Sequence, residues 1–147
     1  MTINKSLEIK SSIITLNKIA NNQLILMDKI GSLRCVELEK YKTVSGFKSN
    51  IIQERSWGNH MCVSASGLYA ACIIPHTNEA ILYDVAKKKR LYTTSEHKGD
   101  IESICIDDNE DYFITGGTDG KTLVYNLKTA KLVYSFPSQA DYITALA

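Results

Sequence analysis

Short apolar runs that recur at a fixed interval constrain the fold of this chain more than any other feature. Val, Ile, Tyr and Thr are frequent in these runs, of which EAILYDV and TLVYNL are two, and clusters of Gly, Asn, Asp and Ser separate them. Such runs are typical of half-buried β-strands joined by tight turns. Tyr83 and Tyr125 lie 42 residues apart near the ends of two runs, and Ile101 and Ile143 lie at the same interval. The sequence therefore predicts an all-β fold made of repeated four-stranded units.

The clearest unit is the range 97–127, HKGDIESICIDDNEDYFITGGTDGKTLVYNL, which resembles a WD40 repeat without a gap. His97 lies at the histidine of the family's Gly-His element, although Glu96 replaces the glycine. Tyr125 and Asn126 lie where the family has its Trp-Asp dipeptide. The resemblance implies a WD40 β-propeller, in which each blade is a four-stranded sheet.

The resemblance also implies a structural hydrogen-bond network in this blade. Thr115 occupies the Ser/Thr position of the second strand, and Asp119 occupies the aspartate position of the tight turn, where Gly120 tolerates a positive φ. In the family a hydrogen-bond chain runs from this aspartate to the histidine, the Ser/Thr and the Trp, so the candidate network residues are His97, Thr115, Asp119 and Tyr125. A phenol hydroxyl at position 125 reaches a different point from an indole N–H. The alternative interpretation places His97 and Asp119 in ordinary exposed loops.

The other units match the pattern less well. Blades are expected over the ranges 6–48, 58–95 and 97–137, with the first strand of a further blade at 141–147. A propeller closes its ring with four to eight blades, so we expect an incomplete ring and an N-terminal portion of a longer propeller. The exposed sheet faces of such a portion predict self-association, as a dimer.

Three further motifs are weak candidates for a metal site, a calcium loop and a localisation signal. A metal site drawn from His60, Cys62, Cys72 and His76 fits no standard zinc spacing, and the cysteines are better interpreted as buried apolar residues. The run DDNED begins like a calcium loop but lacks the Gly and the bidentate Glu that such a loop needs. The run KKKR is either a nuclear localisation signal or an ordinary exposed turn, and we favour the turn. No cofactor, metal or catalytic residue is therefore assigned.

Charge and hydropathy narrow the class of partner. Lys and Arg number 17 against 16 Asp and Glu, so the net charge of +1 does not favour nucleic acid or an acidic membrane surface. The sequence contains no signal peptide and no apolar run of the length needed to span a membrane. We expect a cytoplasmic location.

The WD40 resemblance implies a non-catalytic platform that binds a protein or peptide partner. Trp57, the single tryptophan, is a possible partner-binding residue, or alternatively a cover over the blade ends. The loops around Trp57, His97 and Asp141 would form the binding rim. The alternatives are an enzyme or small-molecule-binding propeller whose site lies in blades outside this sequence, and a β-sandwich in which the repeat is coincidental. The Lys-, Ile- and Asn-rich composition is also loosely similar to bacterial WD40 accessory proteins of respiratory nitrate reductases, which would imply an assembly factor.

Overall fold

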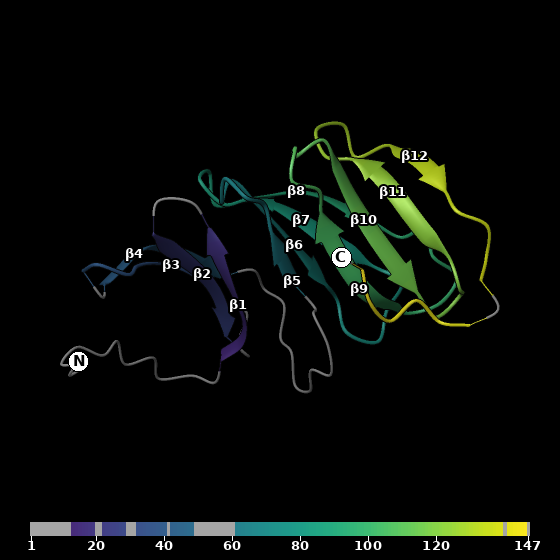
Figure 1. The fold of residues 1–147 in the computed structure, drawn as a ribbon, viewed down its shortest axis with the longest axis horizontal. Helices are drawn as coiled ribbons and strands as arrows, with labels where there is room; N and C mark the ends of the chain where they lie inside the picture. The colour runs from purple at the N-terminus through teal and green to yellow at the C-terminus, as the bar shows by residue number, and fades with distance from the viewer. Residues whose placement is uncertain are drawn as a thin grey trace. The chain divides into compact units, whose positions relative to one another are not determined.

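The computed structural model describes residues 13–19, 22–28, 32–40, 42–48, 61–139 and 141–146, and these residues form strands and turns without any helix (Figure 1). The strands belong to three four-stranded antiparallel sheets, in each of which neighbouring strands follow chain order. Sheet A contains β1 (Ile13–Ile19), β2 (Gln23–Asp28), β3 (Ser32–Glu37) and β4 (Lys42–Lys48). Sheet B contains β5 (Met61–Val63), β6 (Tyr69–Ile73), β7 (Ala80–Asp84) and β8 (Lys89–Thr94), and sheet C contains β9 (Ile101–Ile106), β10 (Tyr112–Gly117), β11 (Thr122–Asn126) and β12 (Leu132–Ser135). The predicted all-β fold of repeated four-stranded units is confirmed.

The chain divides into two compact units, residues 1–54 and residues 55–147. Sheet A belongs to the first unit, where Ile25, Met27 and Leu33 are almost fully buried. The carboxylate of Asp28 is also buried, and it accepts hydrogen bonds from the Ser32 backbone and, at 2.9 Å, from the Arg34 guanidinium. Because a buried carboxylate needs such partners, these bonds tie the end of β2 to β3.

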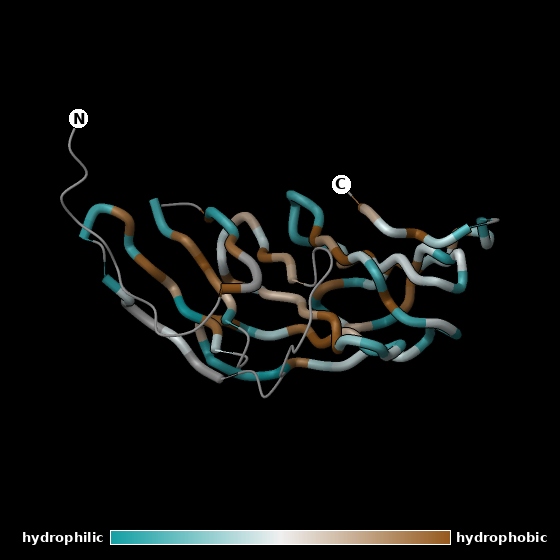
Figure 2. Tube along the Cα trace, turned by 90° about the horizontal axis from the view of Figure 1, so that it is seen from below, coloured by the Kyte–Doolittle hydropathy of each residue, from teal (hydrophilic) through white to brown (hydrophobic). Residues whose placement is uncertain are grey.

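Sheets B and C share one hydrophobic core in the second unit. Figure 2 shows hydrophobic stretches, in brown, interspersed with hydrophilic ones along the trace. Alternate residues of β6, β7 and β11 belong to this core, as the period of a β-strand requires. Phe113 and Tyr125 stack at a centroid distance of 4.9 Å, and Tyr92 of sheet B approaches Phe113 at 6.1 Å. The core residues are Ala71, Ile73, Ala80 and Leu82 from sheet B, with Ile101, Ile104, Phe113, Leu123, Tyr125 and Leu127 from the segment of sheet C.

The register of the strands preserves the sequence repeat. Val36, Tyr83 and Tyr125 all lie on the third strand of their sheets, opposite Leu24, Ala70 and Phe113 on the second strand. Cys72 pairs with Ile81 as Thr115 pairs with Leu123. Cys72 therefore occupies in sheet B the position that Thr115 occupies in sheet C.

Residues 141–146 differ from the strand expected at 141–147, because the described part of this segment is irregular. The Ile143 backbone N–H donates to the Gly117 carbonyl at 3.2 Å, and the Ser103 hydroxyl donates to the Ile143 carbonyl. A β-strand needs a row of such bonds to a neighbouring strand, and these two contacts attach the segment to sheet C without forming a ladder. Within the ranges that the structure describes, no helix is long and apolar enough to cross a membrane.

A buried hydrogen-bond network as candidate functional site

The candidate network surrounds the tight turn between β10 and β11. The Gly120 N–H donates to the Gly117 carbonyl at 3.1 Å, which closes the turn. Gly120 has a φ of 72°, the left-handed conformation that glycine adopts without strain. A Cβ atom at this position would also lie 2.5 Å from the Gln139 carbonyl oxygen. The Asp-Gly pair therefore forms the turn as predicted. The turn directs the Asp119 carboxylate toward the loop between β8 and β9.

The carboxylate of Asp119 is the centre of the network. It accepts hydrogen bonds from His97 Nδ1 at 2.9 Å, from the Lys98 backbone N–H at 2.9 Å and from the Lys121 backbone N–H at 3.1 Å. Partial burial alone would raise the pKa of this carboxyl, but the Lys98 N–H, the His97 side chain and the Lys121 N–H favour the charged form, so that its pKa lies below the ordinary value. Asp119 thus ties the β8–β9 loop to the β10–β11 turn.

His97 links this turn to the interior of sheet C. Its side chain is buried, and its Nε2 atom lies 2.8 Å from the Thr115 hydroxyl oxygen. Asn78 of sheet B's β6–β7 loop donates to the His97 carbonyl at 2.8 Å. A Cβ atom at Gly117 would lie 2.7 Å from His97 Nδ1. The second glycine of the Gly116-Gly117 pair therefore leaves the space that the imidazole fills.

Tyr125 is fully buried, but its hydroxyl bonds to a partner outside the family pattern. The phenol donates to Glu96 Oε2 at 3.1 Å, and the same carboxylate oxygen accepts the Ser95 backbone N–H at 2.9 Å. A phenol has one hydrogen to donate, so this hydrogen does not continue the chain to Thr115. Burial raises the pKa of Tyr125 above the ordinary range and the nearby Glu96 carboxylate raises it further, with smaller opposing effects of the hydroxyls of Thr94 and Thr115.

The structure thus brings His97, Thr115 and Asp119 into direct contact, whereas the Tyr125 hydroxyl donates its hydrogen to Glu96. Trp57 and His60 lie outside the described residues. Sequence reasoning missed Glu96, whose only signal was its place at a position where the family has glycine. It also missed Gly116, where a Cβ atom would lie 2.3 Å from the Ile143 side chain.

Cys62 and Cys72 of the second unit are neutral thiols within or near its core. Cys72 is fully buried, and burial raises the pKa of its thiol to about 12. Burial raises the pKa of Cys62 well above its usual value, with smaller contributions from Cys72 and Cys105. Metal ligation requires thiolates, and across the described part of the chain no group of three or more His, Cys, Asp or Glu residues is arranged to hold a metal. His76, the described histidine of the metal site considered from the sequence, lies in the β6–β7 loop with a φ of 59°.

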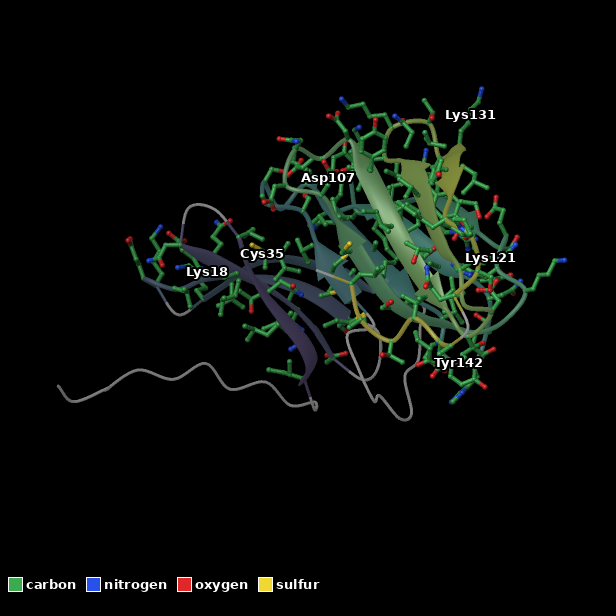
Figure 3. All side chains as sticks on the ribbon, turned by 45° about the vertical axis from the view of Figure 1, so that its right-hand side comes forward. Lys18, Cys35, Asp107, Lys121, Lys131 and Tyr142 are labelled. Carbon is green, nitrogen blue, oxygen red and sulfur yellow. The ribbon has the colours of Figure 1, made fainter. Side chains whose placement is uncertain are left out.

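The acidic β9–β10 loop is a structural turn. Asp107 Oδ1 accepts the backbone N–H groups of Asp111 and Tyr112, which caps the turn. Glu110 accepts two hydrogen bonds from Ser66 in the β5–β6 loop, one from its N–H and one from its hydroxyl. Asp107 lies at one end of sheet C, whereas Lys121 and Tyr142 lie at the other end (Figure 3). Asp107 thus stabilises the loop itself, and Glu110 joins the loop to the β5–β6 turn of sheet B.

The basic run at residues 87–90 begins in the exposed β7–β8 turn. The Lys87 backbone N–H donates to Asp84 at 2.8 Å, and the Lys87 ammonium pairs with the same carboxylate at 3.0 Å. The Lys87 N–H bond is the main cause of a pKa of Asp84 below its ordinary value. This geometry is that of an ordinary capped turn.

Comparisons with known proteins agree with the sheet geometry. No protein-family model matches the sequence. Over 58 residues the chain is 24% identical to DmX-like protein 1 from Homo sapiens, a match that covers 40% of this chain and 2% of that protein. The solved structures of U3-55K and of the RRP9 WD40 repeats superpose on 96% of this chain with a TM-score of 0.73, at 16% identity in both cases. The chain spans 44% and 43% of the length of these two chains.

The superposition, the antiparallel order within each sheet and the Asp119–His97–Thr115 chain all describe the same architecture. The three blades in the described part of the chain are fewer than the four to eight that a closed propeller contains. This chain has the WD40 β-propeller fold, and its three four-stranded sheets are WD40 blades.

Proposed function

We propose that this chain is a non-catalytic protein-interaction scaffold that binds a protein or peptide partner in the cytoplasm. Tyr142 is the observation that carries the proposal: its side chain is 63% exposed, the largest exposed fraction among the large hydrophobic residues that the structure describes. Tyrosine is enriched among the residues that dominate binding energy at protein interfaces. An exposed aromatic residue on an ordered support is therefore a suitable anchor for a partner.

The support beneath Tyr142 comes from sheet C. The Tyr142 backbone N–H donates to the Asp141 carboxylate at 2.8 Å. The next residue, Ile143, is hydrogen-bonded through its backbone to the Gly117 carbonyl and the Ser103 hydroxyl. Tyr142 and Lys121 lie at the same end of sheet C (Figure 3). Because the Asp119 network holds the turn at this end, the binding surface is preorganised, which lowers the entropic cost of binding.

The partner's chemistry follows from charge and from the predicted rim. A net charge of +1 supports a protein or peptide rather than nucleic acid or an acidic membrane. Trp57, which precedes β5 in the sequence, would be a second aromatic anchor. In this role the chain would act as an accessory or assembly factor of a larger complex. The more specific role, an accessory protein of a respiratory nitrate reductase, rests on composition alone.

A matched pair of variants tests the scaffold. Affinity capture of the chain, with crosslinking and mass spectrometry, should recover a stoichiometric partner that Tyr142→Ala loses. Leu68→Ala is the control, because Leu68 is 49% exposed in the β5–β6 turn, at the end of the sheets opposite the network. A partner retained by Tyr142→Ala would exclude this anchor, and capture without any partner after crosslinking would contradict the scaffold.

We also propose that the chain of 147 residues pairs with a second copy of itself. Several large apolar side chains of sheet C are exposed, including Val133 at 54% and Phe136 at 47%. Contiguous exposed apolar surface is unusual in monomers and typical of interfaces.

A further inference from the structure

Asp119 and Gly120 form the only Asp-Gly pair in the sequence, and Lys121 marks its place at one end of sheet C (Figure 3). Of all aspartyl pairs, Asp-Gly converts most readily to isoaspartate, because glycine has no side chain to hinder the reacting backbone nitrogen. This conversion is a spontaneous modification of the main chain. The turn at the centre of the network is therefore built from the most reactive aspartyl pair that a sequence can contain.

The modification proceeds in two steps that need only water. In the first, the Gly120 nitrogen bonds to Asp119 Cγ, the amide hydrogen and the carboxyl O–H group leave together as water, and a succinimide ring remains. In the second, water adds to one of the two ring carbonyls. Cleavage of the N–Cγ bond restores aspartate, whereas cleavage of the other ring bond to this nitrogen gives isoaspartate. Isoaspartate inserts one carbon atom into the main chain and attaches its carboxylate one carbon closer to it.

Hydrogen bonds restrain both reacting groups in the folded chain. The Asp119 carboxylate accepts one from His97 Nδ1 at 2.9 Å and two from backbone N–H groups, at 2.9 and 3.1 Å. The Gly120 N–H, which must lose its hydrogen in the first step, donates to the Gly117 carbonyl at 3.1 Å. The aspartate side chain must also rotate toward this nitrogen, so its hydrogen bonds have to open before the ring can close.

The backbone around the pair is restrained as well. The Asp119 carbonyl accepts the Ser138 hydroxyl at 2.9 Å, and the Gly120 carbonyl accepts the Gln139 N–H at 2.8 Å. The β8–β9 loop packs directly against the turn, since a Cβ atom at Gly99 would lie 3.0 Å from the Asp119 nitrogen. Reaction at this pair therefore requires local opening of the turn, a step that is distinct from unfolding of the whole chain.

We infer that Asp119 is a site of isoaspartate formation that its hydrogen bond to His97 keeps latent. The Asp119 side chain is only 9% exposed. Against the effect of burial, the backbone and His97 hydrogen bonds hold the pKa of this carboxyl below its ordinary value, and the charged carboxylate resists attack by the nitrogen. Once formed, isoaspartate draws its carboxylate back toward the main chain and away from His97. The modification would therefore release the β8–β9 loop from the turn without cutting the chain, and this chemistry is independent of any partner.

Incubation of the chain in ¹⁸O-labelled water measures the reaction, because each hydrolysis of a succinimide leaves one labelled oxygen at position 119. Peptide mapping by mass spectrometry, with fragmentation that separates aspartate from isoaspartate, locates the label. The folded chain should gain label there at least about tenfold more slowly than the chain in urea, since one hydrogen bond to a charged group is worth about this factor. Asp100 is the internal control, because the branched side chain of Ile101 hinders the same reaction. Equally fast labelling of the folded and unfolded chain would overturn the protection, and an unfolded chain without label at position 119 would overturn the site.

A pair of variants assigns the protection to His97. His97→Ala removes a contact of the Asp119 carboxylate, whereas Leu82→Ala removes a fully buried side chain of sheet B and no contact of the pair. Urea unfolding gives the unfolded fraction of each variant, so that labelling from the unfolded chain can be subtracted. The remaining rate at position 119 should be at least about tenfold higher in His97→Ala than in Leu82→Ala. Equal remaining rates in the two variants would overturn the role of His97.

Discussion

Glu96 accepts a hydrogen bond from the Tyr125 hydroxyl, and both residues occupy positions where the WD40 pattern has a different side chain. Glycine at position 96 would offer no carboxylate, and tryptophan at position 125 would offer an indole N–H in another place. The buried phenol obtains its acceptor from the residue that replaced the glycine. The two departures from the pattern therefore compensate each other.

A double-mutant cycle measures this compensation. Tyr125→Phe should lower the free energy of unfolding by about 0.5–1.5 kcal/mol, because it removes one hydrogen bond and little volume. In a Glu96→Ala background the same substitution should cost less, since the acceptor is already absent. Urea unfolding of the four proteins checks the coupling, and strictly additive effects would show that the two side chains do not interact.

Asp119 predicts a dependence of stability on pH. Its folded pKa lies below the ordinary aspartate value, so its contribution is fully present above that ordinary value, about 3.9, and is lost as pH falls through the folded pKa. Asp119→Asn should lower the free energy of unfolding at neutral pH by about 1–3 kcal/mol, because the buried His97 side chain loses a charged acceptor. The loss should shrink as the pH becomes acidic.

Thermal or urea unfolding across this pH range measures the effect. Asp108→Asn is the control for charge, because Asp108 is exposed in the β9–β10 loop. An Asp119→Asn variant whose loss of stability is independent of pH would rule out a contribution from this carboxylate's ionisation.

Two backbone positions should respond to opposite substitutions with opposite signs. Gly120→Ala should destabilise the chain by about 1–2 kcal/mol or more, because Gly120 has a φ of 72° and no room for a Cβ atom. Ala130 has a φ of 61° in the β11–β12 turn, so Ala130→Gly should stabilise the chain slightly. Chemical unfolding measures the free energy of unfolding of both variants. A change of the same sign in both variants would disprove the conformational argument.

The buried tyrosines predict a loss of stability in alkaline solution. Burial is the main cause of raised pKa values for both Tyr92 and Tyr125. A tyrosine with a raised folded pKa stabilises the fold below its unfolded value, about 10, and this stabilisation is lost as pH rises through the folded value. Tyr92→Phe should weaken the alkaline dependence and, through the lost bond to the Leu127 carbonyl, lower stability by about 0.5–1.5 kcal/mol at neutral pH. Ultraviolet titration of tyrosinate in the wild type and the variant follows the ionisation directly.

The fold followed from the sequence because its signals are local. Alternating apolar residues and the Asp119-Gly120 turn each depend on a few neighbouring positions. The interval of 42 residues then extends these local signals to whole sheets. This consistency across levels made the four-stranded units predictable.

The contacts that complete the site were not predictable in the same way. Glu96 and Tyr125 are far apart in the sequence, and only the path of the β8–β9 loop brings them together. Gly116 and Ile143 meet because an irregular segment returns to sheet C. Such pairs depend on tertiary geometry, which a strand pattern does not encode.

The tautomer of the His97 imidazole tests the central claim, which is that a hydrogen-bond chain from Asp119 through His97 to Thr115 holds this end of sheet C. Long-range ¹H–¹⁵N correlation spectra at neutral pH distinguish the two ring nitrogens. Because Asp119 is an acceptor and the Thr115 hydroxyl can donate, the neutral imidazole should carry its hydrogen on Nδ1 and accept at Nε2. An imidazole with its hydrogen on Nε2, or one that averages freely between both tautomers, would contradict the network.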